Sequence, residues 1–109
     1  MSWLFAYGTL RQREVQLAVF GRELTGEPDA LTGFELSTVT IGDPEVVATS
    51  GLAEHLILRR SDIGEEITGV AYSVDEADLI KADAYETSAY QRTKATLKSG
   101  RRAFVYVAA

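Results

Sequence analysis

The chain has 109 residues with 46% hydrophobic and 25% charged side chains, so we expect one ordinary globular domain over residues 1–109. Its net charge of −5 argues against binding to the phosphate backbone of nucleic acids. Cysteine is absent and histidine occurs once, which excludes disulfides, thiolate nucleophiles and multi-histidine metal sites and favours a reducing cytoplasm.

The N-terminal third predicts a strand and then a helix. Residues 3–7 are apolar and end at Gly8, as in a short buried strand that runs into a turn. Residues 11–21 follow with a helical stripe that Gly21 ends. The stripe consists of Val15, Leu17, Ala18 and Val19. No apolar run approaches the roughly 18 residues of a membrane span, and the first residues lack a signal peptide's basic region, so we expect no membrane partner.

The middle third predicts extended chain. Residues 30–41 are rich in β-branched side chains and predict one strand with a bulge at Gly33. Residues 41–51 predict a turn, a short extended piece and a second turn. Residues 54–60 and 66–74 predict two strands that pair around a polar connection.

The C-terminal third predicts a helix and a hairpin. Residues 74–86 have helical spacing, with Asp75 as the N-cap and Asp78 three residues later. Leu79 and Ala82 share the inward face with Tyr85 or Glu86. Residues 90–98 and 101–109 predict two strands around a Ser99–Gly100 turn. The order β-α-β-β-β-α-β-β predicts an α+β fold, in which a small, mostly antiparallel curled sheet or β-barrel is flanked by helices.

Two stretches contain side chains and backbone suited to chemistry. The first is "YGTL" at residues 7–10, which either simply reverses the chain after a strand or offers backbone N–H groups to an anion. The second is "YETSAYQR" at residues 85–92, which places Glu86 at a helix C-terminus. A solvated glutamate is the common interpretation of such a residue. If the tyrosines and the sheet shelter Glu86, its pKa rises towards the value that a general base needs.

The two stretches together resemble the gamma-glutamylcyclotransferase-like family, which is also described as AIG2-like. "YGTL" near the N-terminus, then "TGVAYSV", a helix, "DAYETSAYQR" and a final "RAFVYV" occur in the family's order over nearly the whole chain. The sequence differs from the family pattern at Ala82, where leucine is frequent, and at Thr87, where glycine is frequent. The resemblance implies a small curled barrel flanked by helices.

The resemblance also implies the site. Tyr7, Gly8, Thr9 and Leu10 would hold the carboxylate of a small γ-glutamyl substrate, with Gly8 letting it approach the main chain. Glu86 corresponds to the catalytic glutamate of the family, and Tyr90 to a substrate-binding tyrosine. The implied enzyme releases 5-oxoproline and a free amine or amino acid, without a cofactor or metal. The substrate's α-amine attacks its own γ-carbonyl, with Glu86 as general acid and base.

Two other functions remain open. A non-catalytic member of the same fold would bind a small acidic metabolite at residues 7–10, and a structural subunit would use the barrel for protein contacts. Glu86 favours the enzyme, because a carboxylate adds nothing to the binding of an anion. The leaving amine, the oligomeric state and the roles of Arg11, His55 and Arg92 stay undetermined by the sequence.

Overall fold

A computed structural model describes residues 1–109, which fold into short strands with three helices between them. The strands are β1 (Ser2–Ala6), β2 (Gly26–Leu31), β3 (Phe34–Thr40), β4 (Glu54–Arg60), β5 (Ile67–Val74), β6 (Tyr90–Thr96) and β7 (Arg102–Ala108). The helices are α1 (Arg13–Phe20), α2 (Pro44–Ser50) and α3 (Glu76–Tyr85), with a 3-10 turn, η1, at Thr9–Arg11. None of the helices is long and apolar enough to span a membrane.

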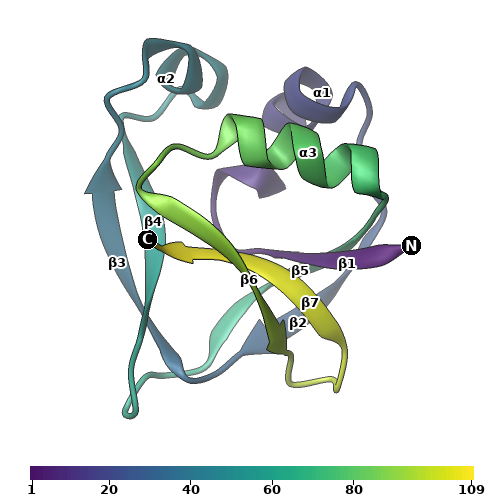
Figure 1. The fold of residues 1–109 in the computed structure, drawn as a ribbon, viewed down its shortest axis with the longest axis vertical. Coiled ribbons are helices and arrows are strands. Elements are labelled where there is room, and N and C mark those ends of the chain that lie inside the picture. Colours follow the sequence, from purple (N-terminus) through teal and green to yellow (C-terminus); the bar gives the residue numbers. More distant parts are fainter.

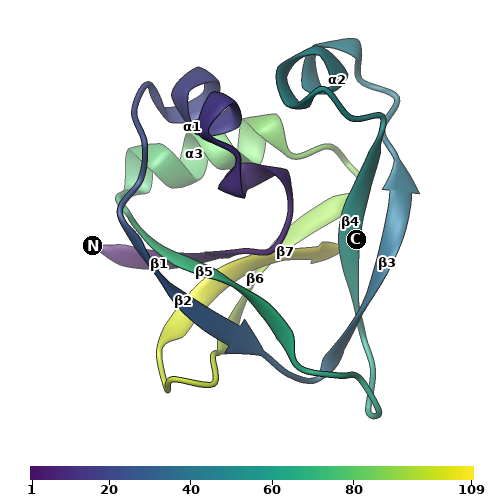
Figure 2. The same cartoon turned by 180° about the vertical axis from the view of Figure 1, so that it is seen from behind.

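A curled five-stranded sheet forms the centre of the molecule, in the order β2-β5-β1-β7-β6. β1 pairs antiparallel with β5 and parallel with β7, and the β3–β4 pair forms a second antiparallel sheet. Figures 1 and 2 show α1 and α3 side by side over one face of the large sheet and α2 at the end of the β3–β4 pair. The predicted α+β architecture with a curled, mostly antiparallel sheet is confirmed.

The curl brings the two edges of the large sheet together. The backbone N–H of Lys98, in the β6–β7 turn, donates to the carbonyl of Ala30 in β2 at 2.8 Å. Asp29 accepts hydrogen bonds from the Ser99 backbone at 3.2 Å and from Arg101 at 2.9 Å. These bonds satisfy backbone groups that an open sheet edge would leave exposed.

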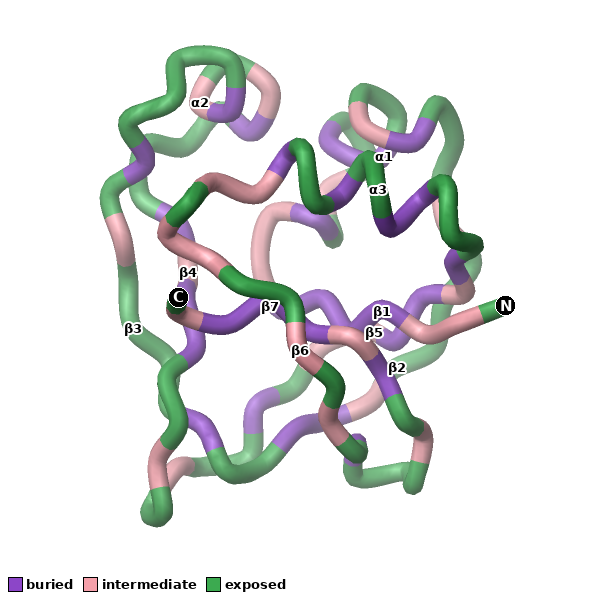
Figure 3. Tube along the Cα trace, viewed as in Figure 1, coloured by how far each residue is buried: buried purple, intermediate pink, exposed green.

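β1 has hydrophobic contacts on both faces. Its alternate residues Leu4 and Ala6 belong to the core beneath the helices, whereas Phe5 belongs to the core between the two sheets. This arrangement explains the continuous apolar run, because a strand covered on both faces has no solvated side. In Figure 3, the buried stretches concentrate in the central strands, while β3 is mostly exposed. Because β1 is buried on both faces, the residues that follow it, beginning with Tyr7, start inside the protein.

The strand predictions for residues 30–74 were partly wrong. Residues 30–41 contain the end of β2 and all of β3, which belong to different sheets, because the chain turns at Gly33, where φ is +86°. Residues 54–60 and 66–74 do form strands, but they do not pair with each other. β4 pairs with β3, and β5 lies between β1 and β2. Pairing depends on partners distant in sequence, which the local pattern does not specify.

The prediction of an extended piece at residues 41–51 was also wrong, because this segment contains α2. The Asp43 side chain accepts a hydrogen bond from the Glu45 N–H at 2.9 Å, and Pro44 occupies the first turn. Gly51 ends the helix with a φ of +74°. The start and stop signals were present in the sequence.

The predicted helices α1 and α3 are confirmed, but the predicted inward face of α1 is partly wrong. Asp75 and Asp78 cap the start of α3 reciprocally, with the backbone N–H of each bonded to the other's carboxylate at 2.9 and 2.8 Å. α1 ends at Gly21 as predicted. Its inward face was predicted only in part: Val15 is buried and Val19 packs against the core, but Leu17 and Ala18 are exposed. The buried side is formed by Val15, Gln16 and Phe20.

Candidate active site

The segment after β1 forms one wall of a pocket. The chain leaves β1 at Ala6, turns through Gly8 and enters η1, where the Arg11 N–H donates to the Gly8 carbonyl at 3.1 Å. The N–H of Gly8 has no acceptor within the chain. The Thr9 hydroxyl is bonded to the Tyr85 hydroxyl at 2.8 Å. This bond ties the turn to the C-terminal end of α3.

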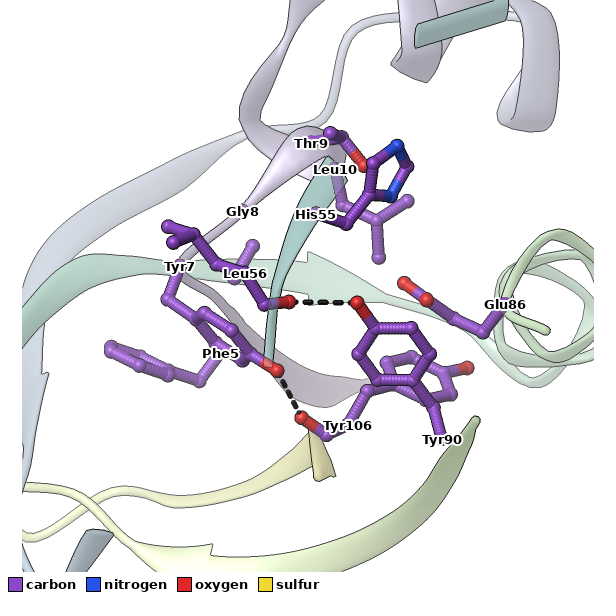
Figure 4. A pocket seen from close by; sticks show the side chains of 11 residues that line it. Phe5, Tyr7, Gly8, Thr9, Leu10, His55, Leu56, Glu86, Tyr90 and Tyr106 are labelled. Carbon is purple, nitrogen blue, oxygen red and sulfur yellow. Dashed lines mark hydrogen bonds between the residues drawn. The ribbon is translucent and has the colours of Figure 1, made fainter. Parts of the chain in front are cut away.

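Glu86 forms the opposite wall. It is the C-cap of α3, where its backbone N–H donates to the Ala82 carbonyl at 3.0 Å. Its side chain is partly buried and accepts no hydrogen bond within the chain; no fully enclosed polar side-chain atom lacks a partner, so the carboxylate is open to the pocket. Burial raises the pKa of Glu86 to about 8, since the charged form loses its hydration. Figure 4 shows the carboxylate directed into the same space as Leu10, His55 and Tyr90.

Four tyrosines surround this carboxylate, yet none donates to it. The hydroxyls of Tyr7 and Tyr90 donate to the backbone carbonyls of Tyr106 and Leu56, at 2.6 and 2.7 Å. The hydroxyl of Tyr106 donates to Asp83 at 2.6 Å, and that of Tyr85 is bonded to Thr9. Burial raises the pKa of all four phenols, so they remain protonated at neutral pH. Because each hydroxyl is used elsewhere, Glu86 lacks the hydrogen bonds that would lower its own pKa.

The pocket consists of a narrow slot and a larger cavity. The slot has a volume of about 20 Å³, which suits one water-sized group, and Glu86, Tyr90 and Tyr106 line it. The larger cavity has a volume of about 480 Å³ and includes Arg11, Gln12 and Glu54. Both spaces are bordered by Gly8, Thr9, His55 and Leu56. A small group can therefore reach Glu86 while the remainder of its molecule lies in the larger cavity.

The structure brings every residue proposed for the site to the slot. The lining includes the catalytic candidate Glu86 and the substrate-binding candidates Tyr7, Gly8, Thr9, Leu10 and Tyr90. Arg92 lies outside the slot, where it pairs with Asp83 at 3.2 Å and stacks over Phe104. No three His, Asp or Glu side chains lie close enough together to hold a metal ion.

The amino-acid sequence matches one known protein family over almost its whole length. A model of the family described as "Gamma-glutamyl cyclotransferase, AIG2-like" matches residues 4–109. The chain belongs to this family. None of the curated proteins matches the sequence.

Three solved structures share the fold of this AIG2-like chain. The crystal structure of the uncharacterised protein PH0828 from Pyrococcus horikoshii is 16% identical, with a TM-score of 0.67, and the match covers 99% of this chain and 78% of that one. The solution structures of At3g28950.1 and At5g39720.1 from Arabidopsis thaliana are 20% and 18% identical, with TM-scores of 0.70 and 0.69. Each match covers 98% of this chain, and 61% and 68% of those chains.

Sequence reasoning missed several side chains in the site of this AIG2-like protein. Tyr106 lines the slot from β7, and Phe5 and Leu56 line it from β1 and β4. His55 borders both spaces, although its role was left open by the sequence analysis. Tyr106 lies in a continuous apolar run, which indicates burial but not which face of β7 it occupies, and no local signal indicates that β4 lies beside the turn after β1.

The fold of this AIG2-like protein has room for a side chain at position 8. A Cβ at this position meets no atom within 4 Å, and φ is −126°. No part of the protein needs the space beside Gly8. If the missing side chain matters, it is because a ligand approaches the main chain there. We expect Gly8→Ala to leave the melting temperature nearly unchanged but to weaken ligand binding, because its methyl group occupies the pocket.

The control for this prediction is Gly100→Ala in the β6–β7 turn. Gly100 has a φ of +94°, so alanine there is strained and should lower the melting temperature without changing ligand affinity. Calorimetric titration and thermal unfolding of both variants would measure the two effects. Equal losses of affinity in the two variants would contradict a role of Gly8 in binding.

Proposed function

We propose that this protein is a γ-glutamyl cyclotransferase that releases 5-oxoproline and a free amine or amino acid from a small γ-glutamyl compound. The observation that carries the proposal is the Glu86 carboxylate, which has a pKa of about 8, lacks a hydrogen-bond partner and lines a water-sized slot. The slot faces the Tyr7–Leu10 turn, whose Gly8 N–H has no acceptor within the chain. The family match over residues 4–109 supports this class of activity.

The proposed reaction uses groups of the chain and of the substrate. The substrate's α-ammonium gives a proton to the Glu86 carboxylate, and the resulting amine attacks the γ-carbonyl carbon. A C–N bond forms and closes a five-membered ring, while the C–N bond to the leaving amine breaks. The leaving nitrogen takes that proton from Glu86. The ring nitrogen then gives up its second proton, so that the lactam keeps one N–H and the released amine departs as an ammonium group. An amine held against its own carbonyl reacts without the entropy loss of a bimolecular encounter.

The Tyr7–Leu10 turn would bind the negatively charged group of the substrate. The free N–H of Gly8 is an uncharged donor that can bond to a carboxylate or to the oxyanion that forms during attack. The half-open larger cavity offers room for the leaving group. The expected cytoplasmic location and a cofactor-free reaction are part of the same proposal.

A panel of γ-glutamyl amines and γ-glutamyl amino acids, assayed for 5-oxoproline, tests the function directly. Release of 5-oxoproline from at least one member supports the cyclotransferase and identifies its leaving group. A second candidate function is the binding of a small acidic metabolite without turnover. Calorimetric binding of panel members without 5-oxoproline release would favour that function over the enzyme.

The pH dependence offers a further test. A general base must be ionised to accept the ammonium proton, so kcat/KM should rise as the pH approaches about 8. At higher pH it should fall again, because the free substrate's own ammonium group loses its proton. A bound ammonium favours the charged carboxylate, so kcat should stop rising at a lower pH than kcat/KM. Initial rates between pH 5 and pH 10, at limiting and at saturating substrate, would measure both profiles. A flat kcat/KM profile between pH 6 and pH 9 would contradict the role of Glu86.

A further inference from the structure

His55 is held in one orientation by its own chain. The residue lies on β4, and its side chain is buried. Its Nε2 lies 3.0 Å from the Leu52 carbonyl oxygen and 3.0 Å from the Ser50 hydroxyl. A carbonyl oxygen only accepts hydrogen bonds, so Nε2 carries the ring proton. The other ring nitrogen, Nδ1, therefore has a free lone pair.

The Ser50–His55 contact is not a nucleophile paired with its base. In that arrangement Nε2 would accept the serine proton, whereas here it donates to Leu52. The Ser50 hydroxyl donates to the Val46 carbonyl at 2.9 Å. Ser50 is also absent from the lining of the slot and of the larger cavity. Ser50 and Leu52 together fix the ring and its tautomer.

The free Nδ1 faces the space in front of Glu86. It has no partner in the chain, and every fully enclosed polar side-chain atom does have one, so Nδ1 is reached from the pocket. Figure 4 shows one ring nitrogen of His55 turned towards Glu86 and the other turned away. No hydrogen bond joins Nδ1 to the carboxylate. Two acceptors thus line a slot of about 20 Å³ from different elements.

We propose that His55 Nδ1 is a second acceptor for the substrate's α-ammonium group, which it holds in the slot while Glu86 takes the proton. This proposal rests on the proposed function for the identity of the ligand. An ammonium group is the size of a water molecule and has three N–H donors, so it can bond to Nδ1 and to Glu86 together. A neutral imidazole suits this role because it accepts a hydrogen bond without competing for the proton. Burial lowers the pKa of His55 and keeps the ring neutral at pH 7.

Two substitutions separate the two nitrogens of the ring. In His55→Gln the amide reaches the position of Nε2 and can donate to Leu52, but no acceptor remains at Nδ1. In His55→Asn the amide oxygen lies near the position of Nδ1, and the bond to Leu52 is lost. We expect His55→Gln to raise KM by about ten-fold to a hundred-fold, the usual effect of losing a hydrogen bond to a charged group. His55→Asn should melt at a lower temperature but keep KM within a few-fold of wild type. The opposite pattern would show a purely structural residue and overturn the proposal.

Nuclear magnetic resonance tests the contact without turnover. His55 is the single histidine of the chain, so ¹⁵N-labelled imidazole in a protein without a histidine tag reports on this ring alone. The free protein should have protonated Nε2 and unprotonated Nδ1. L-glutamate should shift the Nδ1 resonance, whereas glutarate, which has the same carboxylates without the amine, should not. A protonated Nδ1, equal responses to both compounds, or no response to L-glutamate would overturn the proposal. Because this readout needs no reaction, an Nδ1 response without 5-oxoproline release would reject the cyclotransferase and retain the His55 contact.

Discussion

Replacing Glu86 by glutamine should reduce 5-oxoproline release by about 10²–10⁴-fold, the usual contribution of a general base. The amide has the size of the carboxylate, so the slot keeps its shape, but it cannot accept a proton from an ammonium group. Binding of a γ-glutamyl ligand should persist, because the Tyr7–Leu10 turn and His55 remain. Turnover and calorimetric binding of the same preparation would measure both.

The same variant should also be more stable than wild type at neutral pH. The pKa of Glu86 is about 8 in the folded chain, against an ordinary value of 4.5. The folded chain favours the protonated form of Glu86. The stability that goes with this form is fully present below about pH 4.5 and is lost as the pH rises from there to about 8. Glutamine does not ionise, so Glu86→Gln should melt at a higher temperature at pH 7 and at the same temperature below pH 4.

Glu76→Gln is the matched control, because Glu76 is an exposed residue at the other end of the same helix. Its turnover and melting temperature should stay close to those of wild type. If Glu86→Gln turned over substrate within a few-fold of wild type, Glu86 would be an ordinary helix-end residue. A lower melting temperature of Glu86→Gln at pH 7 would instead contradict the desolvated carboxylate.

Replacing Asp78 by asparagine should destabilise the fold by about 2 kcal/mol at pH 7. The Asp78 side chain is 2% exposed and accepts two hydrogen bonds from Arg22, at 2.8 and 2.7 Å. It also accepts the Asp75 N–H at the start of α3. The guanidinium of Arg22, opposed by burial and aided by the Asp75 N–H, holds the pKa of Asp78 at about 2. For a domain of this size, the loss corresponds to a fall of roughly 10 °C in melting temperature.

The destabilisation caused by Asp78→Asn should become smaller as the pH falls. The folded pKa of Asp78 lies below its ordinary value of 3.8, so its stabilisation is present above about pH 4 and is lost as the pH falls towards about 2. The difference between Asp78→Asn and wild type should shrink over the same interval. Denaturant unfolding at pH 7, 4 and 2.5 would measure it.

Glu66→Gln provides the control for a salt bridge that contributes little. Glu66 pairs with Lys98, but their side chains are 43% and 63% exposed, so water screens the pair and we expect a change within a few tenths of a kcal/mol. Asp78 lies at the opposite end of α3 from Glu86, so the folded Asp78→Asn variant should keep its turnover well below its melting temperature. Equal stability of Asp78→Asn and Glu66→Gln would contradict the role of the buried ion pair.

The sequence alone determined the features that depend on neighbours a few residues away. Gly21 ended α1, the Asp75–Asp78 pair started α3, and the 90–109 hairpin formed as predicted, because caps and turns are made by local hydrogen bonds. The "YGTL" and "YETSAYQR" stretches also identified the family and named the two walls of the pocket. The signals for α2, Asp43 and Pro44 at its start and Gly51 at its end, were equally local, although the segment was predicted to be extended.

The tertiary structure alone decided strand pairing and the chemistry of the site. β4 pairs with β3 and lies beside the turn after β1, which brings His55 to a pocket that no residue near position 55 indicates. The raised pKa of Glu86 comes from burial among Tyr7, Tyr90 and Tyr106, which lie on three other segments. Those tyrosines do not donate hydrogen bonds to Glu86, because in the folded chain each hydroxyl donates to another acceptor. Desolvation and hydrogen-bond competition depend on groups brought together from distant parts of the chain, and these contacts exist only after folding.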